Sequence, residues 1–249
     1  MKNFLSPAGE RLLAQLSWSR VLLAFDFDGT LGPIVAQRGA AKMRPRTAAL
    51  FAQVCELYPC AVISGRGRRD VSARLGEANV KYVVGNHGLE PGADLASVER
   101  LMARARPLLE KALAPSGGVD LEDKRYSLAI HYRASREKRL ARAAIQAAVA
   151  ALPMRLRIIP GKLVVNLLPS GAPNKADALL QLRAKANSDT APYVGDDVTD
   201  EDVFELDQPG RLVSVRVGRS STSAAPWFLP GQRDIDVLLG KLAVLRRPA

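Results

Sequence analysis

Cysteine, aromatic side chains and long apolar runs are all scarce in this chain of 249 residues. Cys55 and Cys60 are too few for a disulfide framework, and without a second pair they make no zinc site. Aromatic residues are 5% of the chain, which leaves few platforms for stacking nucleic-acid bases. No apolar run approaches the roughly 20 residues that span a bilayer, and residues 1–7 lack the apolar core of a signal peptide. We therefore expect a cytoplasmic location and no membrane partner.

The net charge of +11, from 36 basic and 25 acidic residues, is the one feature of composition that points toward a nucleic-acid partner. The basic residues are spread over several predicted helices rather than gathered in one stripe. This distribution is better explained by solvated helix faces and attraction for a small anionic substrate than by a nucleic-acid-binding surface. We therefore expect no nucleic-acid partner, and the alternative rests on charge alone. Arg246-Arg247, near the end, is compatible with a frayed tail.

Strand and helix patterns alternate over the first part of the chain and again after Pro173. This rhythm predicts an α/β fold with a parallel sheet covered by helices. The expected helices are 7–18, 45–57, 69–75 and 235–245, and the expected strands are 21–25, 60–63, 82–85, 193–194 and 212–217.

The pattern changes over residues 96–168, which we interpret as a domain inserted into a core made of 1–95 and 169–249. Its expected elements follow the order αββαββ: helix 96–113, strands 118–123 and 127–133, helix 136–152, and strands 155–159 and 162–167. Pro160-Gly161 between the last two strands indicates a hairpin turn. The order predicts a small sheet with helices on one face.

Asp26 and Asp28 follow the apolar run Val21–Ala24, so both carboxylates are expected at the C-terminal tip of a buried strand. Ligands of open α/β sheets bind at that edge. Alternation along a strand points the two acids the same way, which suits a nucleophile, a proton donor and acceptor, and a divalent metal between them. The alternative is an ordinary turn, because Asp-Gly is a common turn dipeptide.

Three further groups of residues are expected at strand tips or helix starts. Ser64-Gly65 follows a strand and can hold a phosphoryl oxygen by hydroxyl and amide, although a turn serine that caps the next helix is the better explanation of these residues taken alone. Lys175 opens a helix, where an ammonium group and the helix N-terminus together favour an anion. Four acids within residues 196–201 suit Mg²⁺, and the alternative is an acidic helix start.

Taken together, this order of motifs resembles the haloacid dehalogenase (HAD) superfamily of phosphatases and phosphotransferases, whose core is Rossmann-like. The resemblance implies that Asp26 attacks phosphorus and that Asp28 protonates the leaving oxygen and then activates water. It also implies that Lys175 neutralises charge. The residues it assigns to the phosphoryl group are Thr30, Ser64, Gly65 and Lys175.

The same resemblance implies a Mg²⁺ cofactor. The metal would be held by the Asp26 carboxylate, the Asp28 backbone carbonyl and Asp196. Asp197 and Asp200 would be further ligands or anchors for the ligands.

The inserted domain contains Leu121-Glu122-Asp123-Lys124, then Ser127 and His131-Tyr132-Arg133, which resembles the cap signature of trehalose-6-phosphate phosphatases. In that family the cap glutamate and lysine bind the sugar remote from the phosphate, at positions that match Glu122 and Lys124. A second family glutamate is replaced here by Asn166. The substrate-binding residues expected from the resemblance are Arg66, His87, Glu90, Glu122, Lys124 and Asn166.

The leading hypothesis is a Mg²⁺-dependent phosphatase that hydrolyses trehalose 6-phosphate through an aspartyl-phosphate intermediate. One alternative, motivated by Asn166, is a phosphatase for another sugar phosphate or phosphorylated glycoside. The other is a phosphosugar-binding regulator without catalysis, against which Asp26, Asp28, Lys175 and Asp196 are all present. Either way the partner is a small sugar phosphate, and the oligomeric state is not encoded in any pattern we recognise.

Overall fold

The structure is a computed structural model that describes residues 1–35, 38–92, 94–206 and 208–246. Its contacts divide the chain into two compact units. The core unit comprises Met1–Gly88 with Asn174–Ala249, and the cap unit comprises Leu89–Pro173. The cap unit begins seven residues earlier (89 against 96) and ends five residues later (173 against 168) than the inserted domain expected from sequence.

The core unit is built on a seven-stranded sheet in which every pairing is parallel, as the alternating pattern predicts. In spatial order the strands are β1 (Lys2–Asn3), β11 (Trp227–Leu229), β10 (Leu212–Val217), β9 (Ala191–Gly195), β2 (Leu23–Phe25), β3 (Cys60–Ile63) and β4 (Tyr82–Val84). The short edge strand β1 and its neighbour β11 were not expected, because two or three residues carry no readable alternation.

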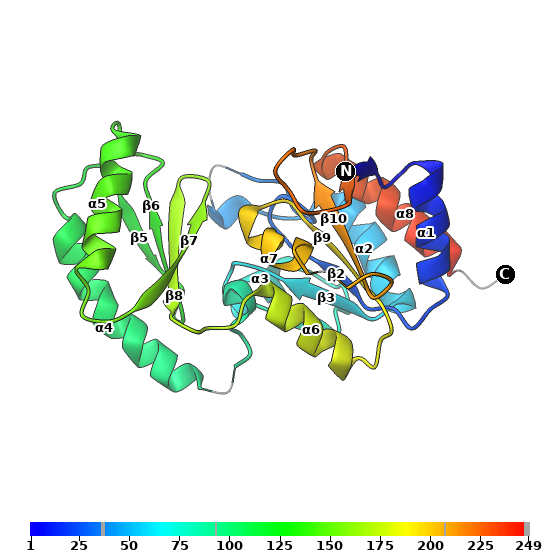
Figure 1. Ribbon diagram of the computed structural model, residues 1–249, viewed down its shortest axis with the longest axis horizontal. Coiled ribbons are helices and arrows are strands. Elements are labelled where there is room, and N and C mark those ends of the chain that lie inside the picture. The colour runs from blue at the N-terminus through cyan, green and yellow to red at the C-terminus, as the bar shows by residue number, and fades with distance from the viewer. Residues whose placement is uncertain (36–37, 93, 207, 247–249) are drawn as a thin grey trace. The chain divides into compact units, whose positions relative to one another are not determined.

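Helices cover both faces of this sheet (Figure 1). One face packs against α1 (Pro7–Ser17), α2 (Pro45–Leu57), α3 (Arg68–Arg74) and α8 (Ile235–Leu245). The other face packs against α6 (Lys175–Lys185) and α7 (Glu201–Phe204). Short 3₁₀ turns are η1 (Arg38–Ala40), η2 (Asn86–Gly88), η3 (Val198–Asp200) and η4 (Gln232–Asp234).

Strand β2 is buried on both faces, as expected of a central parallel strand. Leu23 and Phe25 belong to the apolar cluster beneath α1, α2 and α8, whereas Leu22 and Ala24 belong to the cluster beneath α6. Period-two alternation therefore places the next residue, Asp26, on the α6 side.

The cap unit has the expected αββαββ order: α4 (Leu95–Leu113), β5 (Asp120–Asp123), β6 (Leu128–His131), α5 (Lys138–Ala150), β7 (Leu156–Gly161) and β8 (Val164–Pro169). Its antiparallel sheet has the strand order β5-β6-β8-β7. Helices α4 and α5 pack on one face through an apolar cluster of their own (Figure 1).

The hairpin between β7 and β8 turns two residues later than Pro160-Gly161, so that detail of the prediction is wrong. Pro160 pairs with Val165 and Gly161 with Val164, which leaves Lys162-Leu163 as the turn. Proline is tolerated there because β7 is an edge strand, so its missing N–H removes no ladder hydrogen bond.

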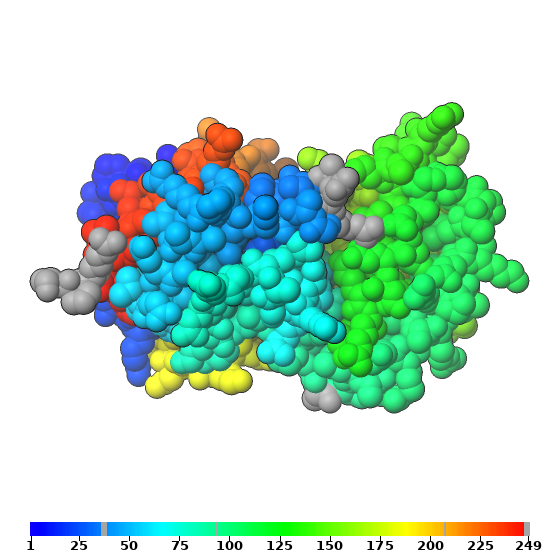
Figure 2. Space-filling model, turned by 180° about the vertical axis from the view of Figure 1, so that it is seen from behind, coloured from blue at the N-terminus to red at the C-terminus, as the bar shows by residue number. Residues whose placement is uncertain are grey.

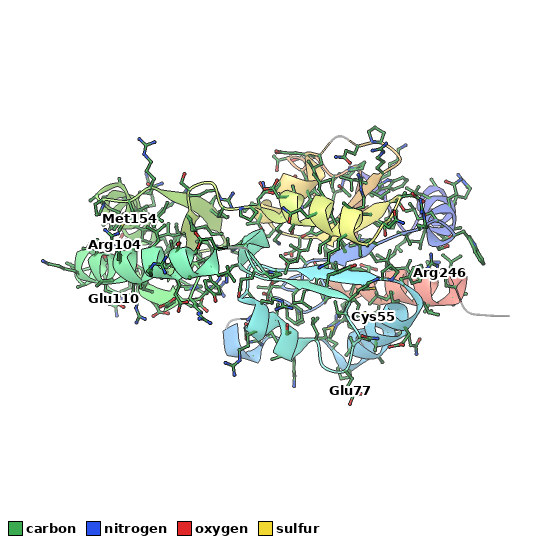
Figure 3. All side chains as sticks on the ribbon, turned by 90° about the horizontal axis from the view of Figure 1, so that it is seen from below. Cys55, Glu77, Arg104, Glu110, Met154 and Arg246 are labelled. Carbon is green, nitrogen blue, oxygen red and sulfur yellow. The ribbon has the colours of Figure 1, made fainter. Side chains whose placement is uncertain are left out.

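Arg246 is anchored rather than frayed, and Arg247 lies outside the described residues. Its guanidinium group donates to the carbonyl oxygens of Ser17 at 2.6 Å, Ser19 at 2.8 Å and Leu57 at 3.0 Å. It also lies 4.2 Å from the centre of the Tyr58 ring. Figure 3 shows this side chain beside α1 and the end of α8. Among the described residues, no helix combines the length and apolarity that a membrane span requires.

Candidate active site

Asp26 lies at the tip of the central strand, where β2 runs between β9 and β3. Its backbone N–H donates to the carbonyl of Val194 at 2.8 Å, which continues the ladder one residue past the strand. The side chain is 6% exposed. A carboxylate buried to this extent requires a compensating partner.

Lys175, the first residue of α6, is that partner. Its ammonium nitrogen lies 3.1 Å from Oδ1 of Asp26 and 2.7 Å from Oδ1 of Asp200. Asn174 caps the helix by accepting from the Asp177 N–H at 2.9 Å, which fixes where the helix begins. Burial opposes the charge on Lys175, but the two carboxylates outweigh it and raise the pKa of the ammonium group. Lys175 therefore stays charged beside Asp26.

Asp200 is fully buried and accepts four hydrogen bonds. The Tyr193 hydroxyl and the Lys175 ammonium donate to Oδ1 at 2.6 and 2.7 Å. The backbone N–H groups of Asp196 and Asp197 donate to Oδ2 at 2.8 and 2.9 Å. Asp200 thus fastens the acidic loop to Lys175, and both of its oxygens are already engaged.

Asp196 faces Asp26 from the end of β9. Oxygen atoms of Asp26, Asp196 and Asp200, one from each, lie within 4.8 Å of one another. Burial, followed by the charges of Asp200 and Asp197, raises the pKa of Asp196 to about 7. Burial also raises the pKa of Asp26, opposed by Lys175 and reinforced by the neighbouring carboxylates.

This donor set fits a metal ion. Carboxylates this close repel one another, and burial together with this repulsion raises the pKa values of Asp26 and Asp196, so a cation between them would be favourable. All the available donors are oxygen atoms, which hard divalent cations prefer. Because the Asp200 oxygens are engaged, Asp26 and Asp196 are the residues that could hold such an ion.

Gly29 allows this packing. Its φ is +82°, and a Cβ atom there would stand 2.1 Å from Oδ2 of Asp196. Thr30, which is fully buried, donates from Oγ1 to Oδ1 of Asp196 at the long distance of 3.5 Å.

Asp28 is held by Arg66 in a bidentate ion pair. Nε of Arg66 donates to Oδ2 at 2.6 Å and Nη2 donates to Oδ1 at 2.7 Å. Strand β2 ends at Phe25, so the alternation expected to orient Asp28 does not reach it. The pair therefore joins the predicted acid–base residue to a residue predicted to bind substrate.

Ser64 and Gly65, directly after β3, form a compact group with His87, which follows β4. Ser64 is fully buried, and its carbonyl accepts from the His87 N–H at 3.0 Å. A Cβ atom at Gly65 would stand 2.5 Å from Cε1 of His87, so only glycine lets the imidazole lie there. Phe25 pairs with Val62, which brings the chain after β3 alongside the chain after β2.

The cap unit holds the other predicted substrate-binding residues. Glu122, Ala129 and Asn166 lie in register across β5, β6 and β8, with the small Ala129 between the two polar side chains. Nε2 of His131 lies 2.9 Å from Oε2 of Glu122, and Lys124 donates to Oδ1 of Asn166 at 3.4 Å. Glu90 is half-buried and precedes α4, outside the cap sheet.

Several residues around the site were not predicted. Tyr193 and Gln232 support residues of the site by hydrogen bonds. The Tyr193 hydroxyl donates to Asp200, and the Gln232 amide donates to the Thr30 carbonyl at 2.9 Å. A single tyrosine in a strand or a glutamine in a loop carries no signal in sequence. Asp70 and Arg74 extend the Arg66 ion pair along α3, and their four-residue spacing was readable.

Comparison with known proteins identifies relatives over most of the chain. The trehalose-phosphatase family profile matches residues 24–232. A trehalose-phosphate phosphatase of Mycobacterium tuberculosis is 34% identical over 199 residues, which are 74% of this chain and 51% of that protein. The chain thus spans about half the length of the curated relatives it matches first.

Two solved structures are similar. The C-terminal domain of the Candida albicans trehalose-6-phosphate phosphatase superposes with a TM-score of 0.80 at 22% identity, covering 95% of this chain and 97% of that one. An Aspergillus fumigatus trehalose-6-phosphate phosphatase gives 0.64 at 25% identity, covering 99% of each chain. The first likeness supports the fold, a HAD-like core with an inserted α/β cap.

Proposed function

The chain belongs to the trehalose-phosphatase family, and from this we propose that it is a Mg²⁺-dependent phosphatase that hydrolyses trehalose 6-phosphate to trehalose and phosphate. One observation carries the proposal. At the tip of the central strand, the buried Asp26 carboxylate lies 3.1 Å from the charged Lys175, with the Asp196 carboxylate beside it. A nucleophile, a fixed cation and an oxygen-donor site are what phosphoryl transfer requires.

In the proposed reaction, the Asp26 carboxylate attacks phosphorus in line while the bond from phosphorus to the sugar oxygen breaks. Asp28 gives its proton to that oxygen, so trehalose leaves as a neutral alcohol. Asp28 then takes a proton from the water that attacks the phosphorus of the acyl phosphate. Phosphate leaves, and the Asp26 carboxylate and the protonated Asp28 are restored.

The other residues of the core bind and orient. Lys175 neutralises negative charge on Asp26 and on the phosphoryl group, and we assign Thr30, Ser64 and Gly65 to the phosphoryl oxygens. Asp26 and Asp196 would hold Mg²⁺, with the Asp28 carbonyl as a further donor, and Asp197 and Asp200 would keep this loop in place. The ion would supply positive charge to the phosphoryl oxygens.

The cap residues would bind the sugar. Glu122 and Asn166 lie on either side of Ala129, a spacing that leaves room for a sugar ring between a carboxylate acceptor and an amide. Lys124 adds a donor beside Asn166. We also assign Arg66, His87 and Glu90 to substrate contact or to bracing the site.

Phosphate release from a panel of sugar phosphates tests the proposal with wild-type protein and Mg²⁺. We expect a clear preference in kcat/KM for trehalose 6-phosphate. A preference for another phosphosugar would favour the alternative that Asn166 motivates. Binding without turnover of any panel member would favour a regulator.

Asp26→Asn tests the mechanism, because the amide keeps the shape of the side chain but cannot attack phosphorus. We expect no turnover, no acid-stable phosphorylated protein after quenching, and unchanged circular dichroism. Asp189→Asn is the matched control, since it removes an exposed carboxylate of the same unit. A fully active Asp26→Asn protein would overturn the mechanism.

A cytoplasmic location belongs to this proposal. It is supported by two buried cysteines that are both free thiols, as is usual in a reducing compartment.

A further inference from the structure

Asp28 is the least enclosed of the proposed reacting groups. It follows β2 in a loop where Gly29 donates to the Gly32 carbonyl at 2.7 Å, and its side chain is 37% exposed. Packing therefore restrains it far less than it restrains Asp26. Acid–base catalysis needs the carboxyl group held within hydrogen-bond reach of the leaving oxygen. Something other than burial has to supply that restraint.

Arg66, which binds Asp28, is the first of three charged residues along α3 and its preceding turn; these residues, Arg66, Asp70 and Arg74, form a row of ion pairs. Residues 66, 70 and 74 are four apart, so their side chains share one face of the helix and its preceding turn. Nη1 of Arg66 donates to Oδ2 of Asp70 at 2.8 Å, and Arg74 donates to Oδ1 of Asp70 from Nε at 3.1 Å and Nη2 at 2.8 Å. Asp70 thus bridges two arginines with its two oxygens.

The far end of the row is tied to the backbone. Nη1 of Arg74 donates to the carbonyl oxygens of Gly39 and Ala41. The guanidinium of Arg66 also lies 5.9 Å from the centre of the fully buried Phe27 ring. Figure 2 shows the surfaces of α2 and α3, in light blue and cyan, next to one another on this side of the core unit. The row therefore connects Asp28 to fixed structure in three places.

Burial of the two arginines distinguishes this row from an ordinary surface ion pair, while the Asp70 side chain between them is 47% exposed. The side chains of Arg66 and Arg74 are 14% and 15% exposed, whereas both members of the Arg20–Asp189 pair are more than half exposed. Isolated exposed pairs restrain little, but linked ion pairs, of which Arg66–Asp28 is bidentate, hold their members in one geometry.

We propose that Asp70 and Arg74 are positioning residues for the acid–base step, acting through Arg66 to hold the Asp28 carboxylate in place. This inference rests on the proposed function, since it assigns a task to a row that ends on the proposed acid. Asp70 touches no reacting atom, and its effect is confined to the two steps in which Asp28 transfers a proton, of which kcat/KM reports the first, protonation of the leaving oxygen. Disrupting the row should therefore lower kcat/KM most for substrates whose leaving group most needs a proton.

Leaving-group dependence in Asp70→Asn tests this prediction. The measured quantity is kcat/KM, which includes only the steps up to departure of the leaving group, for trehalose 6-phosphate, phenyl phosphate and p-nitrophenyl phosphate. The sugar alkoxide needs a proton and p-nitrophenolate does not. We expect a fall of about tenfold or more for trehalose 6-phosphate, a smaller fall for phenyl phosphate and less than about twofold for p-nitrophenyl phosphate.

Two variants complete the test. Asp70→Glu keeps the bridging carboxylate and should restore most of the loss, which a merely structural defect would not predict. Asp189→Asn removes a bidentate pair of the same kind, with distances of 3.0 and 2.7 Å, and should leave all three values unchanged. If Asp70→Asn does not fold, Arg74→Gln is measured instead, with the same order of losses expected.

Equal losses on all three substrates, or no loss on any, would overturn the inference. Failure of the proposed function looks different, because wild-type protein itself would then fail to hydrolyse trehalose 6-phosphate.

Discussion

The carboxylate of Asp196 lies against the α-carbon of Gly29, where a Cβ atom would stand 2.1 Å from Oδ2. Gly29→Ala should therefore push Asp196 away from Asp26, and it also forces alanine into a φ of +82°. We expect kcat/KM for the preferred phosphosugar to fall by about a hundredfold or more, because small displacements at a phosphoryl-transfer site are costly. Mg²⁺ affinity, measured by calorimetry, should fall as well.

Gly240→Ala is the control for that substitution. Gly240 lies inside α8, and a Cβ atom there meets nothing within 4 Å. It should leave activity unchanged and add up to about 1 kcal/mol to the free energy of unfolding. If Gly29→Ala retained wild-type kcat/KM and Mg²⁺ affinity, the loop would have to be able to move without disturbing Asp196.

Asp200→Asn should destabilise the core unit even without substrate. The substitution removes the charge that lies 2.7 Å from the buried Lys175 ammonium, and breaking a buried ion pair from one side costs about 3–5 kcal/mol. Urea unfolding followed by circular dichroism measures this loss. Tyr193→Phe, which removes only the hydroxyl that donates to Asp200, should cost about 1 kcal/mol. Equal costs for the two variants would mean that the charge of Asp200 is not needed.

Mg²⁺ binding should be pH-dependent below neutrality. The pKa of Asp196 is raised to about 7, so at lower pH the carboxyl group carries a proton that the metal must displace. Affinity should rise with pH up to about 7 and then level off, and calorimetry in two buffers should detect proton release at about pH 6 but little at about pH 8.5. An affinity that does not change below neutrality would contradict the assignment of Asp196 as a ligand.

The same shift predicts how the metal-free protein responds to pH. The folded state holds a proton on Asp196 that the unfolded chain, with its ordinary carboxyl pKa, releases. The contribution of this group to the free energy of unfolding is therefore fully present at low pH and is lost as the pH rises toward about 7. Mg²⁺ should offset that loss, which urea unfolding with and without the ion would show.

The proximity of the central residues could be predicted from sequence because parallel strands bring their carboxyl ends to one edge. Asp26, Lys175 and Asp196 follow strands or open helices at that edge, so their meeting follows from topology. The contacts of Asp28 could not be inferred from topology in this way, because β2 ends at Phe25 and the next residues form a loop.

The role of Asp200 and the turn near Pro160 are two further features that the sequence alone did not predict. The acidic cluster alone did not separate a metal ligand from a loop anchor; the difference lies in four hydrogen bonds to Asp200, two from neighbouring backbone N–H groups and two from the side chains of Tyr193 and Lys175. The turn near Pro160 was misplaced because its position depends on β7 being an edge strand, which is a property of the whole cap sheet.

In the cap unit, Glu122→Gln should weaken substrate binding rather than slow the chemical step. The carboxylate lies 2.9 Å from Nε2 of His131, which orients it on the face of the cap sheet opposite α4 and α5. We expect KM for the preferred phosphosugar to rise by about tenfold with a smaller change in kcat, because an amide is a weaker acceptor for sugar hydroxyls. Hydrolysis of p-nitrophenyl phosphate, which lacks the sugar, is the internal control and should not change. A fall in kcat on both substrates would instead indicate a structural role.

Arg246→Ala tests whether the end of α8 is a structural part of the core. The side chain donates hydrogen bonds to three backbone carbonyls, those of Ser17, Ser19 and Leu57, and stacks on Tyr58. Its removal leaves these carbonyls short of a donor, so we expect a loss of about 2–4 kcal/mol in the free energy of unfolding. Arg46→Ala, at an exposed position on α2, should change it by less than about 0.5 kcal/mol. The contacts of Arg246 precede β2 and β3, whereas the proposed reacting groups follow the carboxyl ends of the strands. We therefore expect kcat/KM at low temperature to stay at the wild-type value; equal stability of the two variants would contradict the anchoring role.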